Sequence, residues 1–393
     1  DVDGVTSSHL FLTALRRVGA KVDVVIPHRI QDGYGLSLHL LQQAKEDGVD
    51  TILTCDNGIA AIDEIAWAKA QKMTVLVTDH HAVPFEEHEG RRTEKKSLAD
   101  AVVNPHQQDC GYPYKELCGA GVAWNVIRVL YENYDMDKRE AEDLLDFVAM
   151  ATVCDVMSLT GENRILVKEG LKRIRHTKNI GLQALMQACN VQPENISAYH
   201  FGYVLGPCVN ATGRLDTARH ALRLFETGQE TEAEEIARDL VDLNQERKEM
   251  TLQGVEMAKK LCEEGGYEND PVLVLFLPDV HESIAGLIAG RIREMYNRPV
   301  FVLTRGEEGV KGSGRSTENY SMYENMCGCA ELFTKFGGHP MAAGLSLPEE
   351  NVEKFRRKIN ENCPLTVEEV CPDIHIDMAM PVGYASTELV HQF

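Results

Sequence analysis

The sequence predicts an α/β protein in which a parallel-sheet domain is joined by one long helix to a smaller α/β domain. Three observations support this fold class. In the first half of the chain short apolar runs alternate with helical patterns, which implies right-handed crossovers and a mostly parallel sheet. Residues 230–264 contain one glycine and no proline, as expected of a long helix. Beyond them the alternation of strand and helix patterns begins again.

The elements of the first domain can be justified in chain order. Helical patterns cover residues 5–19, 36–48 and 61–72, and β-rich apolar runs cover residues 21–27, 50–58, 74–81 and 100–105. From about residue 116 to residue 224 the patterns are helical. In open parallel sheets ligands bind beyond the carboxyl ends of the strands. Polar residues at those ends are therefore the first candidates for a functional site.

Residues 230–264 and the segments after them define the rest of the chain. Unbroken, this stretch forms a helix of roughly 50 Å at 1.5 Å per residue, which suits a rigid connection between domains. Strands are expected over residues 271–277 and 299–305, and helices over residues 282–296 and 349–362. We therefore expect domains and segments over residues 1–228, 229–265, 266–363 and 364–393, the last being the start of a further domain.

Composition narrows the class of function. The chain has 393 residues, 44% of them hydrophobic, which is long enough for two domains. The net charge of -21 gives no broad positive field, so a polyanionic substrate needs bound cations or a local basic groove. Eleven cysteines without a CxxC pair favour reduced thiols in the cytoplasm. No apolar run approaches the ~20 residues of a membrane span. Because the chain begins with Asp, we expect further residues upstream.

Acidic and imidazole side chains stand out at four points of the first domain. Three of these points lie where predicted strands end, and the fourth, Asp155, lies on a helical pattern. In chain order they are Asp1, Asp3, Asp56, Asp79, His80, His81 and Asp155. The i, i+2 spacing of Asp1 and Asp3 would point both carboxylates to one side of an extended segment, and Gly4 would turn the chain into the following helix. The fold is expected to bring these groups to one edge of the sheet.

Such a cluster indicates a metal site. Carboxylates repel one another unless divalent cations lie between them, and oxygen ligands with one or two imidazoles suit Mn²⁺ or Mg²⁺ better than zinc. Two ions ~3.5–4 Å apart can activate water and clamp a phosphoryl group, so phosphoester hydrolysis is the predicted reaction. Taken singly, Asp56 could instead cap a helix, Asp155 could be a solvated surface acid, and the histidine pair could be polar surface.

Six segments resemble a known family. DVDG, TCDNG, TDHHAVP and ATVCDV, in this order, are similar to the four motifs of the DHH phosphoesterase superfamily. GSGRS at 312–316 and GGHPMAAGLSL at 337–347 resemble its DHH-associated domain. Within the superfamily, LGPCVNATGRLD at 205–216 and HESIAGLIAGRI at 281–292 resemble the RecJ family. This resemblance implies a 5′→3′ exonuclease with two Mn²⁺ or Mg²⁺ ions that degrades single-stranded DNA to 5′-mononucleotides in DNA repair and recombination.

The resemblance also implies roles for individual residues. The implied metal ligands are Asp1, Asp3, Asp56, His80 and Asp155, with Asp56 bridging both ions. Asp79 would orient His80, and His81 would face the scissile phosphate. The implied substrate-binding residues are Asn210, Arg214, Arg291, Ser313, Arg315, Ser316, Gly338 and His339.

From the residues alone, two of these segments stay ambiguous. GSGRS is equally well an ordinary turn or a phosphate-binding loop, in which glycines let N–H groups approach an oxyanion and the guanidinium grips phosphate. NATGR is equally well a structured loop between helices or a contact to the DNA backbone. The chain departs from the family pattern at Cys208, where arginine is usual, so one phosphate contact is expected to be absent or supplied elsewhere.

The resemblance further implies binding partners and a further domain, and two alternative functions stay open beside it. The expected partners are single-stranded DNA, a single-strand-binding protein and a helicase. No association with a membrane is expected. An OB-fold follows these two domains in the family, and residues 364–393 would be only its beginning. Two other functions stay open: a phosphodiesterase of short RNAs or cyclic dinucleotides, and a non-catalytic replication scaffold that keeps the fold.

Overall fold

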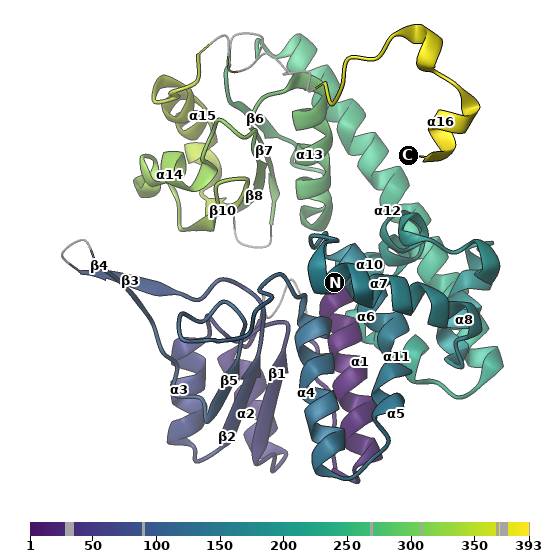
Figure 1. Cartoon of the computed structure of the whole chain (residues 1–393). Coiled ribbons are helices and arrows are strands. Elements are labelled where there is room, and N and C mark those ends of the chain that lie inside the picture. The colour runs from purple at the N-terminus through teal and green to yellow at the C-terminus, as the bar shows by residue number, and fades with distance from the viewer. Residues whose placement is uncertain are drawn as a thin grey trace. The chain divides into compact units, whose positions relative to one another are not determined.

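The structure, a computed structural model, describes residues 1–27, 35–88, 91–267, 270–306, 309–366, 369 and 376–392. The chain divides into two compact units, Asp1–Arg247 and Lys248–Phe393 (Figure 1). The division falls inside the long helix, and our four-part assignment of the chain stays a prediction. Across the described part of the chain, every helix is too short or too polar to cross a membrane.

The first unit contains the predicted parallel sheet. Its strands, in the spatial order β1-β2-β5, are β1 (Thr51–Cys55), β2 (Thr74–Thr78) and β5 (Ala101–Val103). Helices α2 (Leu38–Glu46) and α3 (Ile62–Ala70) share a small apolar core with this sheet. A hairpin of β3 (Phe85–His88) and β4 (Arg91–Glu94) extends away from the sheet (Figure 1).

The strand predicted over residues 21–27 is wrong, because this segment is irregular. Its alternating burial does reflect packing, since Val24 and Ile26 contact the main core of the unit. Period-two burial reports which side chains face the core, but it does not require the ladder hydrogen bonds that define a strand.

A helical layer completes the first unit and contains its largest core. Its helices are α1 (Val2–Arg17), α4 (Gly119–Asn133), α5 (Lys138–Glu142), α6 (Leu145–Cys154), α7 (Gly161–Arg173), α8 (Ile180–Ala188), α9 (Ala198–His200), α10 (Gly206–Leu215) and α11 (Ala218–Glu226). Short turns of helix intervene at η1 (Ile174–His176), η2 (Pro193–Asn195) and η3 (Phe201–Leu205).

The extended segment expected at DVDG is also wrong. Helix α1 begins at Val2, Asp1 is its N-cap, and the Asp1 side chain accepts a hydrogen bond from the N–H of Gly4. Asp3 therefore lies in the first turn of the helix. Aspartate is a favoured N-cap residue, and α1 packs Val2, Val5 and Leu10 into the main core, so the helix forms although its first turns have low intrinsic helix propensity.

Helix α12 (Glu230–Glu264) is the predicted long helix, and it has 35 residues. Ala233 and Ala237 near its start belong to the core of the first unit, whereas Val255 and Ala258 near its end belong to a core of the second. The absence of proline and the single glycine allow one continuous helix to serve both units.

The second unit is built on a mixed five-stranded sheet in the order β6-β7-β8-β10-β9. The strands are β6 (Leu273–Phe276), β7 (Val300–Arg305), β8 (Val310–Arg315), β9 (Lys335–His339) and β10 (Ala342–Leu347), and only β6 and β7 pair in parallel. Alternate residues of β6 and β7 enter two cores, one with α13 (Ala285–Tyr296) and one with α14 (Met322–Cys327) and α15 (Val352–Glu361).

Short helical turns fill the remaining connections of this unit. They are η4 (Glu282–Ile284), η5 (Ala330–Leu332) and η6 (Glu349–Asn351). The strand expected near residues 372–384 lies partly outside the described residues. The described part, residues 376–392, forms η7 (Val382–Tyr384) and α16 (Thr387–Gln392) rather than a strand.

Candidate active site

Two neighbouring strand ends place the first polar groups of the site. Asp56 follows β1 in the left-handed conformation, with φ of 57°, and Asp79, His80 and His81 follow β2. Because β1 and β2 pair in parallel, both segments leave the sheet at the same edge. The Nε2 atom of His80 lies 3.1 Å from Oδ1 of Asp56.

Helices supply the other two acids. Asp3 comes from the first turn of α1, and Asp155 is the C-cap of α6. The Nε2 atom of His80 is 3.5 Å from Oδ2 of Asp3 and 3.6 Å from Oδ2 of Asp155. The structure thus brings three of the predicted acidic ligands together around the imidazole of a fourth, His80. Possible ligand atoms of Asp3, His80 and Asp155 lie within 4.8 Å of one another, as do those of Asp56, His80 and His81.

Asp1 lies beside this cluster without belonging to either group. Its Oδ1 accepts a hydrogen bond of 3.0 Å from the N–H of Gly4. A Cβ atom placed on Gly4 would lie 3.6 Å from Oδ1 of Asp1 and 3.3 Å from Oδ2 of Asp56. Both carboxylates therefore border the space beside Gly4, and the role of Asp1 as a ligand stays a prediction.

Asp79 contacts the ring of His81 and the main-chain N–H of His80, and its expected role in orienting the His80 ring stays a prediction. The buried carboxylate of Asp79 accepts a hydrogen bond from Nδ1 of His81 at 2.8 Å and from the N–H of Ile59 at 2.9 Å. The N–H groups of His80 and His81 also donate to Asp79 Oδ1. In this tight loop the side chain two residues on folds back over Asp79, while the His80 ring turns toward Asp56.

Burial and mutual repulsion perturb the acids strongly. Burial, followed by the charge of Asp3, raises the pKa of Asp56 to about 9. The same two causes raise the pKa of Asp155 to about 6. For Asp79, burial acts to raise the pKa, but the hydrogen bonds from His81 and Ile59 outweigh it and lower the pKa. The hydrogen bond to Asp79 raises the pKa of His81.

The N-terminus of α4 is part of the site and was missed from the sequence. The N–H groups of Gly119 and Ala120 donate to the two carboxylate oxygens of Asp3 at 2.6 and 2.7 Å, as expected at the positive end of a helix dipole. A Cβ atom on Gly119 would lie 2.7 Å from Cβ of Asp56, so only glycine fits there. The signal was present in GAG at the start of a helical pattern.

Asn104 is a second missed residue. It follows β5 directly, is buried, and donates from Nδ2 to the carbonyl oxygen of His81 at 2.9 Å. Its position after the third strand, at the same edge as Asp56, was the available signal. Asn104 therefore braces the loop that carries the histidines.

The NATGR segment is helical, so its interpretation as a loop is wrong. Asn210 and Arg214 lie in α10, and Oδ1 of Asn210 accepts a hydrogen bond of 3.0 Å from the N–H of Val2. This contact fixes the start of α1 beside the acids. Arg214 is half-buried in the last turn of α10, and Cys208 is buried in the same helix.

In the second unit, the first four residues of GSGRS lie in strand β8 rather than in a turn or loop, and Ser316 follows the strand directly. Cβ atoms on Gly312 and Gly314 would lie 2.4 Å from Leu303 and 2.5 Å from Met322, so these glycines are required by the core. Ser316 is also buried and its hydroxyl donates to the carbonyl oxygen of Tyr320 at 2.5 Å; its role in phosphate binding stays a prediction.

The remaining predicted residues of the second unit share one sheet and one helix. Ala342 of β10 pairs with Arg315 of β8 on one side and with His339 of β9 on the other. Side chains of directly opposite residues lie on the same face of a sheet, so these three residues share one face. Ser313 lies two residues from Arg315 and therefore also faces this side. Arg291, on α13, is exposed and lies 3.4 Å from Glu294. Gly338 has φ of 155°, and a Cβ there would meet the Ala342 carbonyl oxygen at 2.5 Å.

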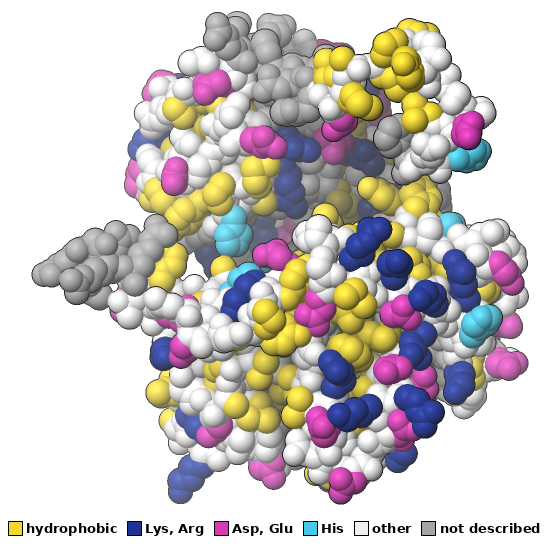
Figure 2. All heavy atoms as spheres, viewed as in Figure 1, with side chains coloured by type: hydrophobic (Ala, Val, Ile, Leu, Met, Phe, Trp, Pro, Cys, Tyr) yellow, Lys and Arg dark blue, Asp and Glu magenta, His cyan; other side chains and the backbone are white. Residues whose placement is uncertain are grey.

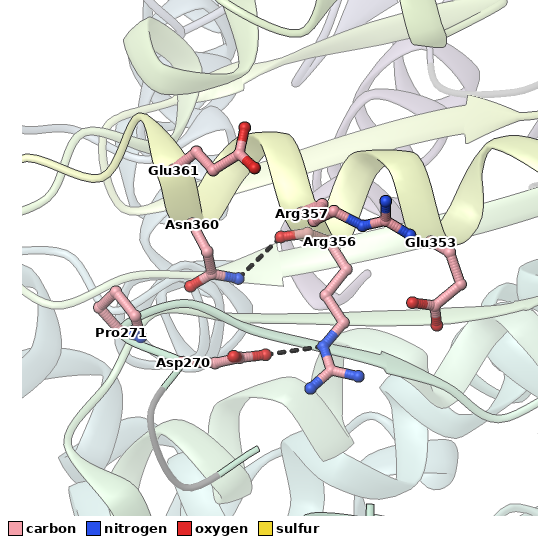
Figure 3. A pocket seen from close by; sticks show the side chains of 7 residues that line it. All are labelled: Asp270, Pro271, Glu353, Arg356, Arg357, Asn360 and Glu361. Carbon is pink, nitrogen blue, oxygen red and sulfur yellow. Dashed lines mark hydrogen bonds and ion pairs between the residues drawn. The ribbon is translucent and has the colours of Figure 1, made fainter. Parts of the chain in front are cut away.

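A separate pocket of about 490 Å³ lies along α15 and contains none of these residues (Figure 3). Two of its charged residues pair with each other, since Nε of Arg356 donates to Asp270 at 2.7 Å; the Arg356 guanidinium also lies 3.6 Å from the ring centre of Tyr267, outside the lining. Figure 3 shows Asn360 and Arg356 bonding to groups within the lining. We assign this pocket to the packing of α15.

Comparisons with known proteins agree with the geometry of the first unit. Residues 1–152 match the DHH family, N-terminal domain, and residues 269–363 match the DHHA1 domain. The chain is 37% identical over 381 residues to "Single-stranded-DNA-specific exonuclease RecJ" of Haemophilus influenzae, covering 92% of this chain and 64% of that protein. It is 34% identical over 394 residues to the protein of the same name from Bacillus subtilis, covering 99% and 48%.

Solved structures extend the similarity to three dimensions. A crystal structure of exonuclease RecJ bound to manganese superposes with a TM-score of 0.79 at 31% identity, covering 94% of this chain and 89% of that one. RecJ from Thermus thermophilus in complex with Mn²⁺ gives a TM-score of 0.77 at 30% identity, covering 92% and 50%.

The fold and these matches define a member of the DHH phosphoesterase superfamily. Within that superfamily, the chain belongs to the RecJ family. It spans 64% of the length of the Haemophilus relative and 48% of the Bacillus relative.

Proposed function

We propose that this chain is the nuclease core of an exonuclease that degrades single-stranded DNA from its 5′ end and releases 5′-mononucleotides. The observation that carries the proposal is the convergence of Asp3, Asp56 and Asp155 on the ring of His80. The names of the relatives support the substrate class. We further propose a role in DNA repair and recombination.

The acidic cluster fits two divalent cations of the Mn²⁺ or Mg²⁺ type. Most of its donors are carboxylate oxygens, the ligands that these ions prefer, with one or two imidazole nitrogens beside them. Burial and the charge of Asp3 raise the pKa of Asp56 to about 9, and a cation between the carboxylates would remove that repulsion. Asp3, Asp56, His80 and Asp155, with Asp1 beside them, would hold the ions. Bound ions of this kind activate water and neutralise charge on a phosphoryl group.

The protein's own groups have complementary tasks in this proposal. Asp79 fixes the ring of His81 and favours its protonated form, while the side chain stays 60% exposed. Such an imidazolium can donate a hydrogen bond to a phosphate oxygen. The amide groups at the start of α4 hold Asp3 in place before any ligand binds, which fixes the geometry on which catalysis depends.

The second unit would bind the phosphates of the strand. Arg315, Ser313 and His339 lie on one face of its sheet, and Arg291 is exposed on α13. Guanidinium groups bind phosphate in bidentate fashion. On the view in Figure 2, Lys and Arg side chains of the first unit are interspersed with Asp and Glu. We therefore propose that a few residues of the second unit, such as Arg315 and Arg291, recognise the phosphates of DNA, rather than a broad basic surface.

Partners and compartment complete the proposal. We propose a single-strand-binding protein and a helicase as partners, because these supply unwound strands. We also propose the cytoplasm as the compartment, which is supported by the ten described cysteines, none of which forms a disulfide.

The proposal is tested with a 5′-phosphorylated single strand. The chain is expected to release mononucleotides with Mn²⁺ or Mg²⁺, to stop when EDTA is added, and to leave the matching duplex intact. Asp56→Asn should abolish release, whereas Asp63→Asn, an acid in the first turn of α3, should not. Activity retained in Asp56→Asn, or preference for a trinucleotide RNA or a cyclic dinucleotide, would overturn the proposal.

A further inference from the structure

Two tyrosines on the first unit expose most of their side-chain surface. Tyr199 is 63% exposed and Tyr203 is 71% exposed, and their rings stack with centroids 5.1 Å apart and planes inclined by 25°. They lie four residues apart, in α9 and in the π-helical turn η3. Phe201 and Leu205 from the same turn are fully buried. The turn therefore anchors itself through one face and presents the paired rings on the other.

The turn η3 packs directly against α6, the helix that ends at Asp155 of the acidic cluster. The carbonyl oxygen of Phe201 accepts a hydrogen bond from Sγ of Cys154 at 3.2 Å. A Cβ atom on Gly202 would lie 3.5 Å from Cγ1 of Val153. Both contacts are with the last turn of α6, whose C-cap is Asp155. The segment that carries the rings is thus held next to one of the proposed metal ligands.

A third apolar group is exposed at the same helix end. Val156 follows Asp155, is 88% exposed, and has φ of 57°. This conformation is unfavourable for a β-branched residue. The end of α6 therefore holds an unusual apolar side chain in water at the edge of an acidic site.

The tyrosine pair contributes little to folding. A ring contact four residues apart on an exposed helical surface stabilises a helix only slightly. Two parallel, solvent-facing rings do, however, offer the surface on which nucleic-acid bases stack, and such stacking tolerates any base sequence. With a net charge of -21, this chain gains less from attraction to phosphates than a basic protein would.

We propose that Tyr199 and Tyr203 form a stacking platform for the bases of the single strand whose phosphodiester is hydrolysed at the neighbouring acidic cluster. This inference rests on the proposed function and adds a positioning surface to it. The platform binds bases, whereas the residues assigned above bind phosphates and cations. It therefore acts on strand affinity and not on the chemical step.

The experiment measures binding and hydrolysis of one labelled strand. The probe is a 5′-phosphorylated oligodeoxythymidine of about 20 nucleotides with fluorescein at its 3′ end, long enough to span several stacking positions. A matched strand carries abasic sites in place of internal bases. Anisotropy gives Kd in the presence of EDTA, and mononucleotide release with Mn²⁺ gives kcat and KM. The variants are Tyr199→Ala, Tyr203→Ala and Tyr203→Phe, and the control is Tyr134→Ala, which removes a tyrosine with 57% exposure at the end of α4.

Each alanine variant is expected to weaken binding and raise KM by about 5-fold to 100-fold, the range found for one stacked base, with kcat unchanged. Tyr203→Phe should match the wild type, because the ring is retained. The abasic strand should bind the wild type more weakly than the normal strand does. Each alanine variant keeps one of the two rings and should therefore discriminate less between the two strands than the wild type. A surface for a protein partner would leave all these constants unchanged, and that result would overturn the inference.

Failure of the platform and failure of the proposed function give different results. If the wild type hydrolyses the strand and the alanine variants match Tyr134→Ala, the platform is wrong and the function stands. If the wild type binds the strand through the tyrosines without hydrolysing it, the function is wrong and the platform stands. If the wild type neither binds nor hydrolyses it, both are wrong.

Discussion

Gly119 is the residue at which a single added methyl group should disable the site. A Cβ atom there would lie 2.7 Å from Cβ and 3.0 Å from Cα of Asp56, and 3.0 Å from Oδ2 of Asp3. Carbon atoms pack best at about 3.5–4.0 Å, so the start of α4 or the Asp56 segment must move by nearly 1 Å. Backbone atoms cannot rotate away as a flexible side chain would.

The magnitude follows from these distances. Overpacking of this kind costs about 1–3 kcal/mol, partly offset by up to about 1 kcal/mol of helix propensity gained from alanine. We expect Gly119→Ala to lower the free energy of unfolding by about 1–2 kcal/mol. A displacement near 1 Å between catalytic groups lowers kcat by about 100-fold. Affinity for Mn²⁺ should fall by at least 10-fold, roughly the loss seen when groups that support metal ligands are altered.

Gly121→Ala is the matched control, two residues further along α4. The nearest atom to its added Cβ would be Cδ2 of Leu117 at 3.4 Å, an ordinary contact. Urea unfolding in EDTA, calorimetric titration with Mn²⁺ and mononucleotide release would be compared for both variants. If Gly119→Ala bound Mn²⁺ and hydrolysed DNA as Gly121→Ala does, the close fit between α4 and the acids would be irrelevant to function.

Three further predictions concern other parts of the chain. Asp79→Asn removes the charged acceptor that holds His81, so kcat should fall about 10-fold to 100-fold with little change in Mn²⁺ affinity, as measured by initial rates and calorimetry. Gly286→Ala places a Cβ atom 2.9 Å from Nη2 of Arg315, so KM for the 5′-phosphorylated strand should rise about 10-fold. Burial, followed by the charge of Arg16, lowers the pKa of His9 to about 4; the unfolded state therefore binds more protons between pH ~6.5 and ~4, and stability should fall by up to about 3 kcal/mol as the pH drops through that window.

Each of these predictions has a control. His81→Ala should reproduce the Asp79→Asn loss, and the double variant should lose no more, because both act through one ring. Gly290→Ala lies on the same helix as Gly286 and meets no atom within 4 Å, so an equal rise in KM would contradict the role of Arg315. In His9→Gln the dependence of unfolding free energy on pH between ~6.5 and ~4 should flatten relative to the wild type. An unchanged slope would exclude His9 as its cause.

The parts of the site at strand ends could be predicted because topology fixes them. Asp56 and the Asp79 triplet follow apolar runs that pair in parallel, so their proximity follows from the alternation of strands and helices. The long helix was equally predictable, since residues 230–264 lack helix-breaking proline. Asp155 could be named as a candidate, but its place beside His80 could not be derived, because its position at the end of α6 depends on tertiary packing.

The errors have local physical causes. The DVDG segment reads as a strand end, but Asp1 caps a helix that begins one residue later. GSGRS reads as a loop because glycine is abundant, yet Gly312 and Gly314 are small where Leu303 and Met322 fill the core. The contact of α4 with Asp3 joins residues 116 positions apart along the chain, a separation that no local pattern reports.

The central claim is that the acids around His80 hold two divalent cations, and anomalous diffraction from a crystal soaked in Mn²⁺ tests it most directly. The account predicts two manganese peaks, both in contact with the carboxylate of Asp56, one of them bound by Asp3, His80 or Asp155. A map with no manganese at this cluster, or with manganese bound only elsewhere on the chain, would contradict the account.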